Sequence, residues 1–208
     1  MEASVRHGNV ATALVDVLVN ASNTQGNLGS GVSAAIRRAC GEQFQTDIHE
    51  ALRARFGNAM EPGDVLVTGA GTHPHARFVA HVAVMDYREQ SAHAAKPDAD
   101  RIRRGCTNLW AELERIDRDN LSVGMVALGA GTGSMGVRQS VDIACTTLRA
   151  HASSHRDSNI GSVVFHGYEL HEYANVVSVV RKHFSIDLSN EPADLIAFVD
   201  TLDSDCGS

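Results

Sequence analysis

Two asparagines and a cluster of glycines share one short segment of this chain. Asn20 and Asn23 follow a mostly apolar stretch, and Gly26, Gly29 and Gly31 come directly after them. Glycine adopts backbone angles closed to other residues and lets the main chain approach a ligand closely. Backbone N–H groups in such a turn can hold a phosphate. The segment therefore has the residue types of an anion-binding loop.

The flanking residues predict the elements that would position this loop. Val15–Val19 is rich in β-branched residues, which suits a strand covered on both faces of a parallel sheet. Apolar residues then recur at helical spacing between Val32 and Ala39. The N-terminus of that helix points at the turn, and its unpaired N–H groups favour phosphate or pyrophosphate. An ordinary strand-to-helix loop is the alternative interpretation.

A second glycine-rich turn has the same surroundings. Val123–Leu128 reads as a buried strand, Gly129–Gly136 as the loop, and a helix with an apolar face follows from Val137. Loops that follow parallel strands meet at the carboxyl edge of the sheet, where open α/β folds bind ligands. The two loops together predict a ligand with two adjacent phosphates.

The remaining pattern is α/β throughout. Helices are predicted over Gln45–Phe56, Asp98–Ile116 and Leu170–His183, each with apolar residues on one face. The polar segment Tyr87–Pro97 lacks periodicity and is predicted to be a surface loop that could reach over the site. The acidic tail 189–208 contains a short amphipathic stretch, which either packs on the body or forms a frayed or partner-binding terminus.

Several segments, in order, resemble the signature of the macro domain family. The first junction reads NASN, GSGV and IRRACG without a gap, against the family's NAAN, GGGV and I.RAAG. HGNV at His7–Val10, GDVLVTGAG at Gly63–Gly71, FVAHVAV at Phe78–Val84 and VVFHGYE at Val163–Glu169 match further family segments. The resemblance covers about Arg6–Phe184. It implies a three-layer α/β/α fold with a mixed, mostly parallel central sheet, comprising residues 1–188, with 189–208 as a tail.

The resemblance also implies a ligand, ADP-ribose, free or attached to a macromolecule. Asn23 matches the asparagine that hydrogen-bonds the distal ribose and is the candidate catalytic residue; its alternative role is turn formation. Tyr168 falls where some members place an aromatic side chain against adenine, or else it is a packed tyrosine at a strand end. The other expected ligand-binding residues are Asn9, Asn20, Gly29, Ser30, Gly31, Val32, Gly131, Thr132, Gly133, Ser134 and Met135.

Three departures from the family pattern bear on ligand preference and on catalysis. Asn9 stands where the family has an aspartate that accepts a hydrogen bond from the adenine amine, and Met135 stands near the place of an aromatic residue over the distal ribose. Ser33-Ala34 replaces the Asp-Gly pair of MacroD-type hydrolases. The usual general base is thus missing, and Asp16, inside the first strand, is the only acidic residue between Asn9 and Glu42.

Two functions remain open at this point. The first is hydrolysis, as a mono-ADP-ribosyl hydrolase or an O-acetyl-ADP-ribose deacetylase. The second is a non-catalytic reader or sensor of ADP-ribose or another NAD-derived nucleotide. The Ser33-Ala34 departure favours the reader, since Asn23 and both loops serve either function.

Composition restricts the remaining classes. The chain has 208 residues, 43% of them hydrophobic, with no apolar run long enough to span a bilayer and no secretory signal. Its net charge of −7 argues against an extensive nucleic-acid surface, and Arg37-Arg38 read as part of a solvated helix face. The four cysteines lack metal-type spacing and the histidines form no zinc motif, so no metal or cofactor is expected. A reducing cytoplasm fits, and the oligomeric state is left open.

Overall fold

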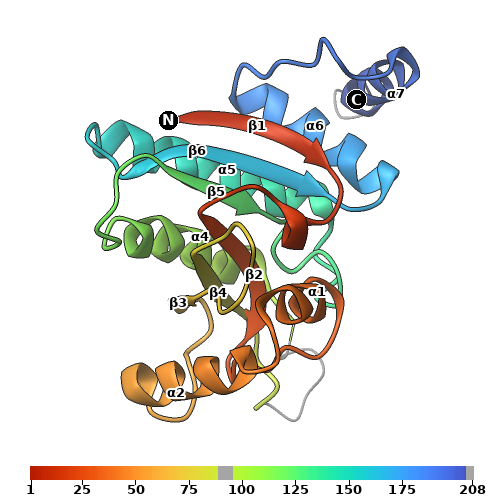
Figure 1. Cartoon of the computed structure of the whole chain (residues 1–208). Helices are drawn as coiled ribbons and strands as arrows, with labels where there is room; N and C mark the ends of the chain where they lie inside the picture. The colour runs from red at the N-terminus through yellow and green to blue at the C-terminus, as the bar shows by residue number, and fades with distance from the viewer. Residues whose placement is uncertain (89–95, 205–208) are drawn as a thin grey trace.

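A six-stranded sheet forms the middle of the molecule, in a computed structural model that describes residues 1–88 and 96–204 (Figure 1). The strand order is β1-β6-β5-β2-β4-β3. All neighbouring strands pair in parallel except β3 and β4, which are antiparallel. The strands are β1 (Glu2–His7), β2 (Val17–Asn23), β3 (Val65–Gly69), β4 (Phe78–Met85), β5 (Leu121–Met125) and β6 (Ile160–Gly167).

Helices cover both faces of this sheet (Figure 1). One face packs against α4 (Ala99–Leu113), α5 (Val137–Ser154) and α6 (Leu170–His183) through the larger apolar core. The other face packs against a short 3₁₀ helix, η1 (Val10–Thr12), with α1 (Gly31–Cys40) and α2 (Phe44–Phe56). Central strands are covered on both sides, which is why β2 and β4 read as nearly continuous apolar runs. The predicted three-layer α/β/α fold is confirmed.

The last helix, α7 (Ala193–Ser204), lies outside α6, at the opposite end of the molecule from α2 (Figure 1). Leu195 and Val199 of α7 pack with Tyr173 and Val177 of α6 in a third, small apolar cluster. Asp203 accepts hydrogen bonds from Ser178 and Arg181. The amphipathic stretch of the tail is therefore a helix held against the body by apolar and charged contacts.

Helix predictions agree with the structure to within three residues at each described boundary, and Leu170–His183 agrees at both ends. Strand β1 was not predicted, because Glu2–His7 alternates in burial at a sheet edge and carries no continuous apolar run. Asp16 was expected inside a strand but precedes β2, where its carboxylate accepts a hydrogen bond of 2.7 Å from the hydroxyl of Ser122. Most of the predicted Tyr87–Pro97 loop lies outside the described residues.

In the described part of the chain, no helix combines the length and apolar character needed to cross a membrane. Cys40, Cys106 and Cys145 are buried and free, as expected for small apolar residues, and burial raises the pKa of the Cys40 and Cys106 thiols to about 12. Cys206 lies outside the described residues.

Candidate ligand-binding site

A cavity of about 830 Å³ lies at the carboxyl edge of the sheet. Strands β1, β6, β5, β2 and β4 all run in the same direction, so the segments that follow them meet at this edge. The volume is within the range of about 300–1,000 Å³ typical of small-molecule sites. Its lining includes one residue at or just after the end of each strand: Asn9 for β1, His166 for β6, Val126 for β5, Asn23 for β2 and Met85 for β4.

Two helices point their N-termini at this edge without side-chain caps. Ser30 precedes α1 and Gly136 precedes α5, and neither supplies a capping hydrogen bond; the first turns of both helices contain no acidic residue. By contrast, Asp98 caps α4 and Glu169 caps α6. Among the described residues, the first N–H groups of α1 have no side-chain acceptor, and such groups favour an anion. Gly29, Gly31, Gly131 and Gly133 of the two loops line the cavity.

The shape of the second loop depends on glycine. A Cβ atom on Gly133 would lie 2.4 Å from the carbonyl oxygen of Gly129 and 2.8 Å from Cγ of Pro97. Gly129 itself has a φ of 74°, a conformation that favours glycine. Conversely, a Cβ on Gly131 in this loop, or on Gly31 at the end of the first loop, would meet no atom within 4 Å, because these residues face the cavity. The loop is packed on one side and open on the other.

Asn23 lies at one end of the cavity, where its side chain organises the turn that follows β2. Its Oδ1 accepts hydrogen bonds from the N–H groups of Gln25 (3.0 Å) and Asn27 (3.2 Å), and its Nδ2 donates to the carbonyl of Asn27 (2.7 Å). This is the turn-forming role that the sequence left as an alternative. The side chain lines the cavity as well, so the turn presents Asn23 and Asn27 together.

A chain of buried hydrogen bonds ends at Ser33 in the cavity wall. Ser33 donates to Oδ1 of Asn20 at 2.9 Å, and Nδ2 of Asn20 is 3.1 Å from Nδ1 of His81. Since an amide nitrogen only donates, Nδ1 of His81 is the acceptor and Nε2 carries the proton, which points to Thr68 at 3.1 Å. Burial lowers the pKa of His81 to about 3, so the ring is neutral. His81 is thus a buried, hydrogen-bonded core residue.

This hydrogen-bond network corrects the role predicted for Asn20. The sequence placed Asn20 in contact with the ligand, but its side chain is fully buried below the cavity. Its amide oxygen accepts from Ser33, and its amide nitrogen donates to His81. Ser134 and Met135 are likewise absent from the cavity lining among the described residues. Met135 turns toward the core and packs against the cluster beneath α5, which leaves Thr132 and Gly133 facing the cavity. The other predicted residues, Asn9, Asn23, Gly29, Ser30, Gly31, Val32, Gly131, Thr132, Gly133 and Tyr168, all line it.

Acidic side chains near the Asn23 end are already paired. Asp86 follows β4 and accepts two hydrogen bonds of 2.9 Å from the guanidinium of Arg88, which lower its pKa to about 2, and a third from Thr24. Among the described residues that line the cavity, Glu172 is the one carboxylate. It belongs to α6 at the other end, where its Oε2 accepts the N–H of Tyr168 at 3.0 Å. The Asn23 end therefore has no described carboxylate available as a base.

The opposite end of the cavity is formed by the segments after β1 and β6. The Gly8 N–H donates to the carbonyl of Gly167 at 2.8 Å, which joins the two segments. Tyr168 is 64% exposed at the rim, so it is not a packed strand-end tyrosine. His166 is 4% exposed; the Gly8 backbone lies near its ring, but no described residue makes a well-formed hydrogen bond with either ring nitrogen. Burial lowers the pKa of His166 to about 4, so its ring is neutral at neutral pH.

Several charged or polar residues of the lining were not among the predicted ligand-binding residues, including Arg38, Asn27 and Glu172. Arg38 was assigned to a solvated helix face, but it lines the cavity two turns into α1, on the face that carries Gly31 and Ala35. For His166 the sequence left open both a place in the pocket and a structural role at the strand end, and it lines the cavity. Helical spacing from Gly31 could have indicated Arg38. No sequence signal separates a partnered from an unpartnered buried histidine.

Among residues 1–88 and 96–204, no cluster of three or more His, Cys, Asp or Glu side chains could hold a metal ion. The polar groups of the cavity include amides, hydroxyls, the guanidinium of Arg38, the imidazole of His166, the carboxylate of Glu172 and the N-terminus of α1. This set binds anions and hydroxyl groups, and it defines a site for a phosphorylated small molecule at the edge of an α/β sheet.

Comparison with known proteins gives this class its family. The macro domain family model matches residues 19–144, and the chain belongs to the macro domain family. An uncharacterized protein of Mycobacterium tuberculosis strain H37Rv is 31% identical over 166 residues, which cover 79% of this chain and 41% of that protein. The O-acetyl-ADP-ribose deacetylase of Enterobacter cloacae is 33% identical over 111 residues, 53% of this chain and 59% of the enzyme. The chain thus spans well under two thirds of these relatives.

Solved structures share the fold at low identity. A mutant Oceanobacillus iheyensis macrodomain with ADPR superposes with a TM-score of 0.70 at 19% identity, covering 86% of this chain and 91% of that chain. The Trypanosoma brucei macrodomain in complex with ADP-ribose gives 0.68 at 22% identity, covering 84% and 67%. At these identities the likeness establishes the fold.

Proposed function

We propose that this protein binds ADP-ribose, free or attached to a macromolecule, and acts as a reader of that group. The observation that carries the proposal is one cavity lined both by the uncapped N-terminus of α1 and by the glycines of the loop that leads to α5. Together they suit two adjacent phosphates. Macro domain structures with ADP-ribose support the choice of nucleotide.

The two ends of the cavity suit the two ends of such a ligand. Asn23 and Asn27 offer amide groups to sugar hydroxyls at the β2 end. Tyr168 and the apolar walls Val10 and Val126 offer a surface for a flat base at the β1 and β6 end. The glycine loops lie between them along the sheet edge, because β5 and β2 are central in the strand order.

Ser33 favours binding over turnover. Its hydroxyl proton is directed to Asn20 and to the carbonyl of Ala21, so the oxygen presents only lone pairs to the cavity. A hydroxyl does not take a proton from water at neutral pH as a carboxylate or histidine does. With Asp86 paired to Arg88 and Glu172 at the far end, no carboxylate among the described residues is left to take the proton of an attacking water.

Hydrolysis is the second candidate, favoured by the relatives named O-acetyl-ADP-ribose deacetylase, among them those of Enterobacter cloacae and Citrobacter rodentium. In this case Asn23 would position the distal ribose. The experiment that separates the candidates incubates the protein with O-acetyl-ADP-ribose and with proteins ADP-ribosylated on acidic residues and on serine. A reader binds these substrates without releasing ADP-ribose or acetate. Turnover that is lost in Asn23→Ala would identify a hydrolase instead.

A further inference from the structure

Asn9 is fixed so that its amino group is left for the ligand. Its Oδ1 accepts the N–H of Ala11 at 3.0 Å and thereby caps η1, and its backbone carbonyl accepts the N–H of Thr12 at 3.1 Å. The side-chain Nδ2 has no hydrogen-bond partner among the described residues, and Asn9 lines the cavity. An amide nitrogen only donates hydrogen bonds. The cavity wall therefore presents a donor at this position.

An aspartate here would present the opposite polarity. It could cap η1 with one oxygen in the same geometry, and its second oxygen would then face the cavity as a charged acceptor. The difference between the two side chains is thus confined to one atom at the ligand surface. A base amine would find an acceptor beside aspartate, whereas a base carbonyl finds a donor beside Asn9.

Two further lining residues supply acceptors at this end. His166 is neutral, so one of its ring nitrogens carries no proton and can accept; the Gly8 backbone lies near the ring, but no described residue makes a well-formed hydrogen bond with either nitrogen. Glu172 uses Oε2 to accept the N–H of Tyr168, and no described residue donates to its Oε1. Arg38 adds further donors and no acceptor. A base at this end therefore meets a donor on Asn9 and acceptors on His166 and Glu172.

We propose that the base end of the cavity prefers a 6-oxopurine to adenine, with Asn9 as the selecting residue. A 6-oxopurine carries a carbonyl oxygen where adenine has an amine, and an N1–H donor where adenine has a bare nitrogen. Asn9 Nδ2 donates to the carbonyl, and an acceptor on His166 or Glu172 takes the N1–H. The inference depends on the proposed binding of a nucleoside diphosphate ribose.

The experiment measures calorimetric Kd values for ADP-ribose and inosine diphosphate ribose with the full chain. One neutral hydrogen bond gained or left unmade changes affinity by about fivefold to tenfold, so the wild-type protein binds the inosine nucleotide about fivefold tighter or better. Asn9→Asp reverses the ratio in favour of ADP-ribose. Asn9→Ser keeps a capping oxygen and replaces the amide donor by a shorter hydroxyl, and brings the ratio close to one.

Asn58→Asp is the matched control, because it adds the same charge at an exposed residue after α2 and leaves the ratio of the wild-type protein unchanged. Tighter binding of ADP-ribose by the wild-type protein overturns the inference, as does a ratio that neither Asn9 variant shifts. If the wild-type protein binds neither nucleotide, the proposed function itself fails and this inference fails with it. If Asn9→Asp does not fold, as judged by circular dichroism, the ratio measured with Asn9→Ser decides.

Discussion

At the scale of single residues, Ser33 is the position where structure and chemistry meet. The resemblance marked it as the place of a missing general base. The structure adds that its hydroxyl is the end of a hydrogen-bond network through Asn20, His81 and Thr68. The replacement is thus integrated into the core as well as exposed to the cavity. Serine at this position contributes to stability while removing a base.

Replacing Ser33 tests that integration. Ser33→Ala leaves the Oδ1 of Asn20 without its donor in a buried site, so we expect a loss of about 1–2 kcal/mol in the free energy of unfolding. Ser30→Ala is the control, because Ser30 is exposed and makes no capping hydrogen bond; its change should stay below about 0.5 kcal/mol. Urea denaturation measures both. Equal losses would mean that the buried chain contributes nothing specific.

Asn23 has two tasks that one variant disrupts together. Asn23→Ala removes the amide from the cavity. It also removes the three hydrogen bonds that hold the turn, one with Gln25 and two with Asn27. We expect binding of ADP-ribose to weaken by about tenfold or more, since each lost hydrogen bond is worth about 1 kcal/mol. Calorimetry measures the change, with the exposed Asn58→Ala as control. Unaltered affinity in Asn23→Ala would exclude this end of the cavity from binding.

The two buried neutral histidines make stability depend on pH. The pKa of His166 is lowered to about 4 and that of His81 to about 3 by burial, whereas the unfolded chain protonates both near pH 6.5. Below pH 6.5 the unfolded state binds more protons, so the free energy of unfolding falls as the pH decreases toward 4. The slope reaches at most about 1.4 kcal/mol per pH unit for each histidine.

His166→Phe isolates one share of this effect. The variant loses one titrating group, so the dependence between pH 6.5 and 4 should become shallower by up to one proton. His171→Phe, an exposed position on α6, is the control and keeps the wild-type slope. Urea titrations at several pH values measure both. A slope that His166→Phe does not reduce would show that this histidine is not buried in its neutral form.

At the scale of elements, periodicity and glycine placement were sufficient for most of the fold. The helix over Leu170–His183 was bounded correctly because its apolar stripe begins and ends there, and both glycine loops were found between a strand and a helix. Strand β1 escaped because edge strands carry no continuous apolar run. The burial of Asn20 also escaped, because one side chain's direction depends on partners in β4 and α1.

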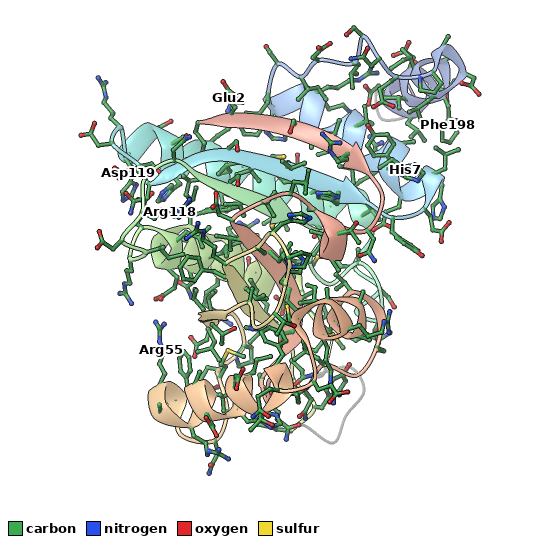
Figure 2. All side chains as sticks on the ribbon, in the orientation of Figure 1. Glu2, His7, Arg55, Arg118, Asp119 and Phe198 are labelled. Atoms are coloured by element: carbon green, nitrogen blue, oxygen red, sulfur yellow. The ribbon has the colours of Figure 1, made fainter. Side chains whose placement is uncertain are left out.

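Helix α7 depends on α6 for its position. Val199 is fully buried between the two helices, whereas its neighbour Phe198 is 45% exposed on α7 (Figure 2). We expect Val199→Ala to lower the free energy of unfolding by about 2 kcal/mol through lost burial and a residual cavity. Phe198→Ala removes a larger side chain but should cost less than about 1 kcal/mol. Thermal or urea denaturation compares them, and a larger loss in Phe198→Ala would contradict the packing of α7.

At the scale of the whole molecule, the net charge is negative, whereas the charges at the cavity are mixed. The chain carries −7 overall, but the described residues that line the cavity bring one guanidinium (Arg38), one carboxylate (Glu172) and the N-terminus of α1. An anionic ligand would therefore depend on these local groups and not on a general basic surface. The end of the cavity near β1, where Figure 2 labels His7, and the end near β2 are set apart by the strand order (Figure 2).

The most direct test of the account is a calorimetric titration of the full chain with ADP-ribose, repeated on Gly31→Glu. We predict one site with a Kd in the micromolar range, about −8 kcal/mol. In Gly31→Glu, a carboxylate at the first turn of α1 would occupy the phosphate position, so binding should weaken by at least about a hundredfold. Gly57→Glu, at an exposed glycine after α2, controls for the added charge and side chain. Failure of the wild-type protein to bind at millimolar ligand, or equal affinity in Gly31→Glu, would contradict the proposed site.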